Sequence, residues 1–321
     1  MRIVTNWPAI PERWQAANGR SGSAVHRRTL ADLRDAAGPQ DSVYLINCDP
    51  GLTMGVALAN LRPGARRPLV ASDMVLRRPE GLKGHLLHPL KRALLSRADL
   101  YINLFRDVRG LTEVFGIPAE RCAFVPFKVN LTEAEMAASP VAEDYVLCFG
   151  RSMRDFDTFF AAMERLPWPG AIARARPADL AAHGARFTWN PDHLPANVVQ
   201  LDDDGTPAAQ ARMLARAKLV VIPVLKSSIV ASGISTALNA MRLGKCVIGS
   251  EGPGMSDVFA SEALTVPAED PAALAAMIDR AWRDDDLRQR TAAAGLAYAA
   301  AQGGEADLAQ RIIDVMAERI P

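Results

Sequence analysis

The apolar positions of this 321-residue chain fall in short runs that alternate with longer amphipathic stretches. The short runs have the length of buried strands, whereas the stretches between them repeat apolar residues at helical spacing. Strand and helix alternating in this way predict a parallel, doubly wound sheet. In the first half the predicted strands are 2–5, 42–47, 68–72, 100–104 and 122–126, and the predicted helices are 23–36, 51–61, 82–98 and 108–115.

The second half repeats this rhythm, which predicts a second Rossmann-like domain. Its predicted strands are 145–149, 171–175, 198–201, 219–223, 246–248 and 263–266, and its predicted helices are 155–166, 207–217 and 233–243. The alanine-rich tail from Pro271 predicts further helices, the last of which could return to the first domain. The polar segment 129–144 is the predicted junction, and we place the boundary between residues 135 and 136.

Composition indicates a globular protein without a dominant charge. The 37 basic and 36 acidic residues nearly balance, which argues against extensive nucleic-acid binding. No run of 18 apolar residues and no signal-peptide core occur, so we expect a cytoplasmic location. The cysteines lie far apart without a CxxC pair and predict buried thiols rather than a zinc site or disulfides; they are Cys48, Cys122, Cys148 and Cys246.

Two segments that follow strands of the second half have the residues of an anion site. A small-residue turn leads into a predicted helix whose first turn would present free N–H groups, which suits a phosphate; it comprises Ser232, Gly233, Ile234, Ser235 and Thr236. After the strand 145–149 come Arg151 and Arg154, and two guanidinium groups at a strand end can converge on one diphosphate.

A glycine-containing loop in the first half is a weaker candidate. Gly19, Arg20 and Gly22 precede the predicted helix 23–36 and could let a phosphate or an acceptor sugar approach the backbone. The loop lacks the GxGxxG pattern, which argues against a nicotinamide-dependent dehydrogenase. The acidic run Asp202–Asp204 is interpreted as a solvated turn rather than a metal site.

The order of motifs in residues 145–300 resembles the C-terminal domain of retaining GT-B glycosyltransferases of the family 4 type, glycosyl transferases group 1. The motifs are CFGRSMRDFDTF, NVVQLDDDG, ARAKLVVIPV, SGISTALNAMRLGKCVIGSEGPGMSDVF and ALTVPAEDPAALAAMI. The first half is similar more loosely, through ADLYINLFRDVRGLTEVFGIPAERCAFVPFKVN. The resemblance implies an α/β GT-B fold of two Rossmann-like, doubly wound domains facing a central cleft. Residues 1–135 would form the acceptor domain and 136–321 the donor domain.

The resemblance also implies roles for individual residues. The diphosphate-binding arginine of the family falls on Arg151, its second basic group falls nearest Arg154, and the helix start at 232–236 would cradle the phosphate. Two glutamates of the family fall on Val230 and Asn239. Asn239 can still hydrogen-bond a ribose hydroxyl, whereas Val230 cannot replace a carboxylate that contacts the transferred sugar.

The resemblance assigns the reaction to transfer of a sugar from a nucleotide-diphosphate sugar to a glycan or glycolipid. The donor would be UDP- or GDP-linked, and neither a cofactor nor a metal would be needed. Asp73 is the predicted polar catalytic group near the reacting sugar. Arg77 and Arg78 would neutralise the leaving diphosphate or bind an anionic acceptor.

The predicted helix around 82–97 is basic and amphipathic, with sequence LKGHLLHPLKRALLSR. Its leucines could face the sheet of the first domain, or the helix could lie on an anionic bilayer and give the protein a peripheral membrane location. His85 and His88 lack partners at ligand spacing, so metal binding there is not expected.

Two alternatives to glycosyl transfer stay open at this level. Because Val230 and Asn239 replace the two glutamates, the chain could be a catalytically weak or inactive GT-B scaffold that binds ligands. A sugar-nucleotide epimerase of the same fold would have similar motifs. Product formation in the absence of an acceptor would distinguish an epimerase from a transferase.

Overall fold

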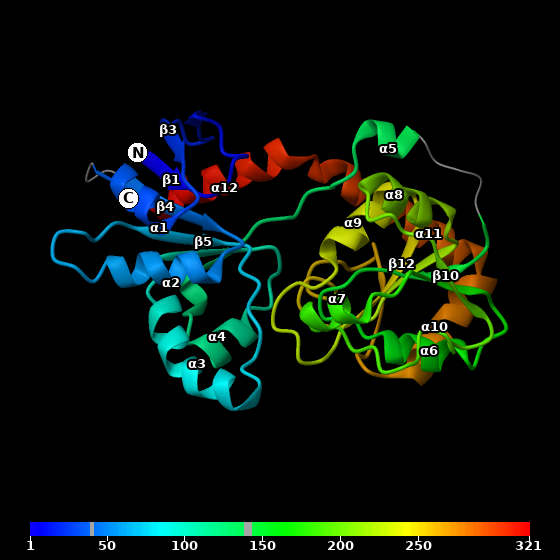
Figure 1. The fold of residues 1–321 in the computed structure, drawn as a ribbon. Coiled ribbons are helices and arrows are strands. Elements are labelled where there is room, and N and C mark those ends of the chain that lie inside the picture. Colours follow the sequence, from blue (N-terminus) through cyan, green and yellow to red (C-terminus); the bar gives the residue numbers. More distant parts are fainter. Residues whose placement is uncertain (39–41, 138–142) are drawn as a thin grey trace. The chain divides into compact units, whose positions relative to one another are not determined.

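The computed structural model describes residues 1–38, 42–137 and 143–321, and the chain divides into two compact units (Figure 1). The first unit comprises Met1–Pro126 and Glu305–Pro321, and the second comprises Phe127–Gly304. The division therefore falls earlier in the chain than residues 135 and 136. Residues 138–142 of the predicted junction lie outside the described residues.

The first unit is built on a seven-stranded sheet with strand order β2-β3-β1-β4-β5-β6-β7. Its strands are β1 (Arg2–Thr5), β2 (Arg13–Gln15), β3 (Ser21–His26), β4 (Ser42–Asn47), β5 (Leu69–Ser72), β6 (Leu100–Asn103) and β7 (Cys122–Phe124). All pairs are parallel except β2 with β3. The strands β4, β5 and β6 are almost wholly buried, which explains their continuous apolar sequences.

The helices of the first unit follow its strands. They are α1 (Leu30–Ala36), α2 (Pro50–Ala59), α3 (Gly81–Leu95), α4 (Arg109–Phe115) and α12 (Glu305–Arg319), with a short 3-10 turn at Ala119–Arg121. Hydrogen bonds join α12 to the N-terminal segment. Trp7 Nε1 donates to Glu305 Oε1 at 2.9 Å, and the Ala17 N–H donates to Asp314 Oδ1 at 2.8 Å. The last helix thus belongs to the first unit although it follows the second in sequence.

The predicted helix 23–36 is wrong in its first part. Residues Ser21–His26 form β3, which pairs in parallel with β1 from Ser23 opposite Arg2, and only Leu30–Ala36 are helical. Pairing with a strand distant in sequence overrides the weak local preference of this segment. The short β2 was not predicted, and its turn into β3 contains Gly19 with φ of +85°.

The second unit is a six-stranded, wholly parallel sheet with strand order β10-β9-β8-β11-β12-β13. Its strands are β8 (Val146–Cys148), β9 (Gly170–Ala173), β10 (Val198–Leu201), β11 (Leu219–Ile222), β12 (Cys246–Ser250) and β13 (Leu264–Val266). This order is that of a Rossmann fold, in which the strand order reverses between β8 and β11. Ligands of such sheets bind outside the carboxyl ends of the strands at that point.

Helices cover both faces of the second sheet. They are α5 (Glu133–Ala137), α6 (Phe156–Met163), α7 (Pro177–Ala182), α8 (Pro207–Arg216), α9 (Ile234–Arg242), α10 (Pro271–Arg283) and α11 (Asp285–Gln302). Alternate strand residues enter separate cores: Leu147 and Val220 pack with α9, whereas Cys148 and Val221 pack with α6 and α10. Among the described helices of the chain, none is sufficiently long and apolar to cross a membrane.

Candidate functional site

A cavity of about 420 Å³ opens at the carboxyl ends of the strands in the second unit. The loops after β8 and β9 and the start of α9 form its walls, so it lies at the point where the strand order reverses. Of the predicted donor-site residues, five line this cavity: Arg151, Arg154, Gly233, Ser235 and Thr236.

The loop that follows β8 is fixed against the end of β11. The Asp155 N–H donates to the carbonyl of Pro223 at 2.9 Å, and the Leu225 N–H donates to the carbonyl of Met153 at 3.0 Å. Both Gly150 and Met153 have positive φ, +106° and +51°, so the loop turns sharply. This geometry directs the chain back under the cavity at Arg154.

Arg154 is a buried cation beneath the cavity, with only 1% of its surface exposed. Two glycines leave room for its guanidinium. A Cβ built on Gly150 would lie 2.4 Å from Arg154 Nη2, and one on Gly233 would lie 2.9 Å from the same nitrogen. Any larger residue at either position would displace the guanidinium, so the two glycines and the arginine form one structural unit.

The charge of Arg154 is poorly compensated within the second unit. Its Nε has no hydrogen-bond partner among the described residues, and its Nη1 donates to the carbonyl of Pro223 at a long 3.4 Å. Burial lowers the pKa of the guanidinium to about 10. A buried polar group without a partner is costly, and an anion in the cavity would supply what Arg154 lacks.

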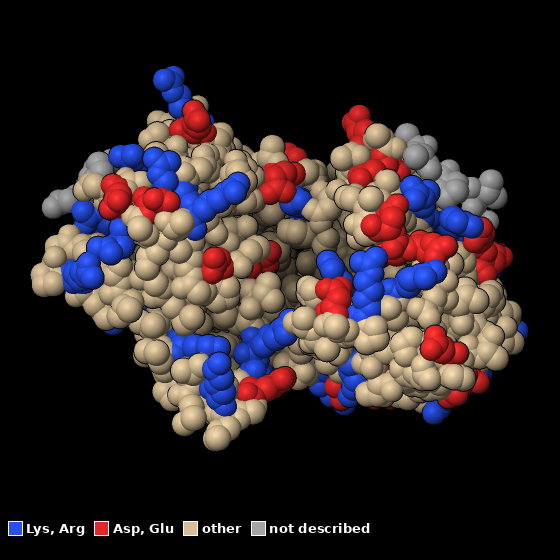
Figure 2. Space-filling model, in the orientation of Figure 1, with Lys and Arg blue, Asp and Glu red and all other residues tan. Residues whose placement is uncertain are grey.

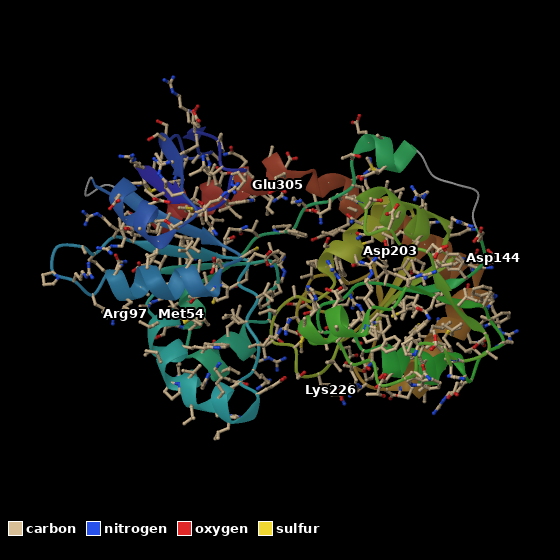
Figure 3. All side chains as sticks on the ribbon, in the orientation of Figure 1. Met54, Arg97, Asp144, Asp203, Lys226 and Glu305 are labelled. Atoms are coloured by element: carbon tan, nitrogen blue, oxygen red, sulfur yellow. The ribbon has the colours of Figure 1, made fainter. Side chains whose placement is uncertain are left out.

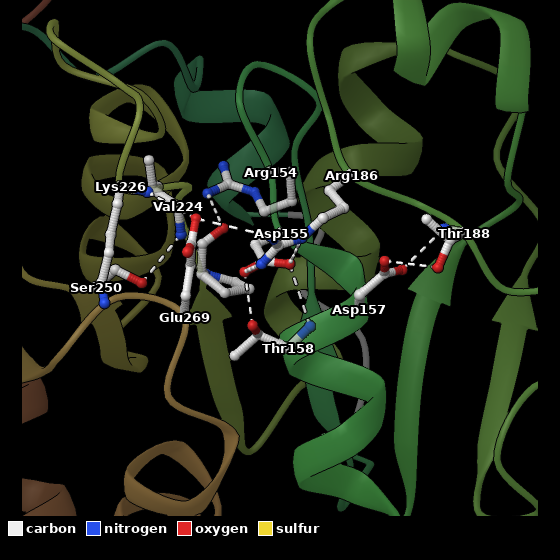
Figure 4. Close-up of polar contacts among 11 residues, drawn as sticks. Arg154, Asp155, Asp157, Thr158, Arg186, Thr188, Val224, Lys226, Ser250 and Glu269 are labelled. Atoms are coloured by element: carbon white, nitrogen blue, oxygen red, sulfur yellow. Dashed lines mark hydrogen bonds and ion pairs between the residues drawn. The ribbon is translucent and has the colours of Figure 1, made fainter.

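The neighbouring Asp155 does not neutralise Arg154, because Arg186 and Thr158 occupy its carboxylate (Figure 4). Arg186 Nε donates to Oδ1 at 3.0 Å and Arg186 Nη2 to Oδ2 at 2.5 Å. Thr158 Oγ1 donates to Oδ2 at 2.6 Å, and the Thr158 N–H donates to Oδ1 at 3.2 Å, which caps α6. The hydrogen bond to Asp155 raises the pKa of Arg186.

The start of α9 forms another wall of the cavity. Its N-cap is Gly233 with φ of +105°, and no side chain caps the helix. The free N–H groups of the first turn carry the positive end of the helix dipole, and Ser235 and Thr236 line the cavity. Ser232 and Ile234 do not: the Ser232 hydroxyl bonds to Ser228 Oγ at 3.0 Å, and Ile234 is buried in the core.

Arg151 differs from Arg154 in exposure and in pairing. Its side chain is 59% exposed and forms an ion pair with Asp179, with Nη1 3.1 Å from Oδ2. Because an exposed ion pair contributes little, Arg151 can exchange this partner at small cost. The sequence thus predicted both arginines as diphosphate ligands and placed Arg151 first. The burial of Arg154 indicates instead that Arg154 is the more important of the two.

Several cavity residues were not predicted from the sequence. Arg174 and Arg176 follow β9, and Asp203, labelled in Figure 3, follows β10. Arg174 pairs with Asp202 at 2.5 Å, and Arg176 Nη2 donates to the carbonyl of Asp203 at 3.1 Å. The sequence pattern that could have predicted Arg174 and Arg176 is a pair of arginines in alternate positions directly after a strand.

The two positions aligned with the glutamates of the family do not line the cavity. Val230 is buried, and the Asn239 Oδ1 accepts the backbone N–H of Asn130 at 2.9 Å. Asn239 therefore holds the segment before α5 within the second unit, and its expected contact with a ribose hydroxyl stays a prediction. Its side-chain oxygen is already used in a local structural bond.

In the first unit, Arg20 and Gly22 of the predicted loop site have structural roles. Arg20 Nη1 donates to the carbonyls of Ala317 at 2.8 Å and Ile320 at 2.6 Å, which caps the C-terminal end of α12. A Cβ on Gly22 would lie 1.9 Å from the Met1 carbonyl oxygen, so close packing requires glycine there. Gly19 and Arg20 precede β3 and Gly22 lies within it, so no helix begins at this loop. A ligand role for the three residues stays a prediction.

Asp73, the predicted catalytic carboxylate, directly follows β5 and is half-buried. It has φ of +49°, and the adjacent Cys48, directly after β4, has φ of +54°. The Cys48 thiol donates to Asp73 Oδ2 at 3.2 Å. Burial raises the pKa of Asp73, and burial together with the Asp73 charge raises that of Cys48. Strained backbone at two adjacent strand ends is typical of a functional site.

The expectation of buried thiols is correct for Cys148 and Cys246 but wrong for Cys48, which is exposed because it lies just beyond its strand; Cys122 is half-buried.

Arg77 and Arg78 are exposed in the segment between β5 and α3. In the acidic run, Asp203 and Asp204 accept hydrogen bonds from the backbone of the following turn. Within the described ranges no group of three or more His, Cys, Asp or Glu is arranged to hold a metal.

Comparison with known proteins agrees with the architecture. Residues 205–297 match the family model described as glycosyl transferases group 1. No curated protein sequence matches the chain significantly. A glycosyltransferase from Rickettsia africae has a TM-score of 0.64 at 10% identity, covering 93% of this chain and 85% of its own.

Two further solved structures have the same fold. Anabaena HepE in complex with UDP has a TM-score of 0.64 at 16% identity, covering 90% of this chain and 82% of its own. Sucrose-phosphate synthase from Thermosynechococcus elongatus has a TM-score of 0.63 at 16% identity, with coverages of 99% and 88%. The chain thus has the two-domain GT-B fold over its whole length, and part of its second unit matches the family model of glycosyl transferases group 1.

Proposed function

We propose that the protein transfers a glycosyl group from a nucleoside-diphosphate sugar to a glycan or glycolipid, with retention of configuration and without a metal. The second unit binds the donor in the cavity beside α9, and the first unit supplies the acceptor side. The chief support is Arg154, a buried cation whose Nε has no partner among the described residues. The structure of HepE in complex with UDP supports a UDP-linked sugar as the donor.

The proposed chemistry follows from the charge that develops during transfer. As the bond from the sugar to the diphosphate breaks, negative charge grows on the leaving phosphate. Arg154 and the N-terminal N–H groups of α9 would stabilise this charge, because both are fixed before the reaction begins. These groups line a cavity in the protein, where interactions between charges are stronger than in bulk water.

On the acceptor side, we propose that the Asp73 carboxylate accepts a hydrogen bond from a sugar hydroxyl. Its position at a strand end and its left-handed backbone support this role. We expect Asp73→Asn to lower kcat/KM roughly 10- to 100-fold, because an acceptor that carries charge is lost. Cys48→Ser keeps the hydrogen-bond donor to Asp73 and should retain most activity. Equal losses in both variants would contradict the assignment.

The raised pKa of Asp73 gives a pH signature. In the folded protein the carboxyl holds its proton to a higher pH than in the unfolded chain, so its contribution to stability falls as pH rises from the ordinary value of 3.8 through the raised value. Transfer requires the ionised form, so kcat/KM should rise with pH over the raised pKa. We therefore expect Asp73→Asn to flatten that limb of the pH profile and to increase Tm at neutral pH.

A nucleotide panel tests the donor assignment directly. UDP and GDP should raise Tm, whereas uridine and guanosine should not, because the diphosphate provides the main interaction with Arg154 and α9. Incubation of the nucleotide sugar with acceptor glycans, followed by NMR of the new anomeric centre, tests transfer and retention, and added EDTA tests metal independence. Binding of UDP without transfer or hydrolysis would indicate a non-catalytic scaffold instead.

A further inference from the structure

The helix α3 in the first unit exposes an unusual row of leucines. Leu82 is 80% exposed, Leu86 71% and Leu90 58%, and these residues recur every four positions along one side of the helix. Leu87 is also exposed, at 41%. A single exposed leucine needs no explanation, but a contiguous apolar surface on one helix indicates an interaction surface.

The opposite side of α3 is the one that packs on the protein. Leu95 is buried, and His88 meets the Phe115 ring edge-on with ring centroids 5.5 Å apart. Arg92 Nη1 donates to the carbonyls of Glu113 and Val114 at 3.0 and 3.1 Å. Leu86 precedes His88 by two positions, which places it about 160° away around the helix. The apolar side of this amphipathic helix therefore points away from the fold, contrary to the sequence interpretation in which the leucines face the sheet.

Basic residues are exposed on α3 and in the segments that flank it in sequence. Lys83 and Lys91 are exposed on α3, Arg97 follows its C-terminal end, and Arg77 and Arg78 precede it. Figure 2, in the orientation of Figure 1, shows mostly tan atoms over the part of the first unit that carries α3, with blue and some red side chains beside them. Exposed leucines flanked by cations complement an anionic bilayer, whose headgroups attract cations while its acyl boundary accepts leucines.

We propose that α3 docks the protein on a membrane surface rich in anionic lipid, with Leu82, Leu86 and Leu90 inserted at the acyl boundary. Only seven residues, 74–80, separate Asp73 from the start of α3. A docked α3 would thus hold the strand end that carries Asp73 close to the lipid surface. The inference stands on exposure and charge within the first unit and needs no catalytic activity.

Flotation of the full chain with lipid vesicles tests the proposal. We expect binding to vesicles of equal parts phosphatidylcholine and phosphatidylglycerol, little binding to pure phosphatidylcholine, and release by added sodium chloride. Leu86→Ser/Leu90→Ser should lower the partition coefficient at least tenfold, as should Lys83→Glu/Lys91→Glu. Because these side chains are exposed, Tm should stay unchanged in both variants.

Matched controls distinguish α3 from the surface in general. Val199→Ser/Leu296→Ser removes two exposed apolar side chains from the second unit, and Arg280→Glu/Arg290→Glu reverses two exposed charges there. Both controls should bind vesicles like the unchanged protein. Absence of vesicle binding, or equal binding by the α3 variants, would overturn the proposal. Dimers in light scattering that Leu86→Ser/Leu90→Ser abolishes, without vesicle binding, would assign the surface to a second copy.

Discussion

Replacement of Arg154 by methionine is expected to abolish measurable nucleoside-diphosphate binding while leaving the free protein equally or more stable. The lowered pKa of the buried guanidinium, about 10 against 12.5, corresponds to a burial cost of about 3 kcal/mol at neutral pH. Methionine fills similar space without that cost, and exchange of buried charges for apolar groups is often neutral or stabilising. Loss of the diphosphate partner should raise Kd at least about 100-fold, equivalent to roughly 3 kcal/mol.

Arg151→Ala is the matched control, since Arg151 lies on the same loop but is exposed and paired with Asp179. An exposed ion pair contributes roughly 0.2–1 kcal/mol, so Kd should change about fivefold or less. Calorimetric titration with UDP and GDP, together with the Tm of each free variant, provides both readouts. The assignment is wrong if Arg154→Met binds UDP as the unchanged protein does, or if Arg151→Ala is the more damaging substitution.

Asp155→Ala is expected to have the largest effect on stability among substitutions around the cavity. Asp155 is fully buried and accepts hydrogen bonds from Arg186 and from the backbone and hydroxyl of Thr158. Its removal leaves Arg186 without its main partner and α6 without its cap, which together should cost about 2–4 kcal/mol. For a unit of this size, Tm should fall by roughly 5–15 °C.

Asp157→Ala provides the comparison for this second prediction. Asp157 lies two residues later and accepts hydrogen bonds from the Thr188 N–H and hydroxyl at 2.8 and 2.7 Å, in a more exposed position (Figure 4). Its removal should cost about 1 kcal/mol or less, because water can replace the lost bonds. Urea unfolding of both variants gives the two free energies. Similar losses for Asp155→Ala and Asp157→Ala would contradict the prediction, which rests on the burial of the Asp155 carboxylate.

The contacts of Arg154 explain why the sequence could predict both arginines of the site but not which of them is buried. A glycine turn before a helix and two arginines after a strand are local patterns, and their position at strand ends follows from the β/α alternation. Which arginine is buried depends on Gly150 and Gly233, which are 83 positions apart in the chain, approaching the same guanidinium. That approach depends on how the sheet packs, and no local sequence pattern predicts it.

The sequence by itself determined the buried parallel strands other than β3, the α/β class and the helix start beside the cavity, because buried parallel strands need continuous apolar runs and tight turns need glycine. Only the tertiary structure decided that Arg20 caps α12, that Asn239 holds Asn130 and that the leucines of α3 face away from the fold. Periodicity shows that a helix has an apolar side. The direction in which that side faces depends on the elements packed against the helix, which are distant in sequence.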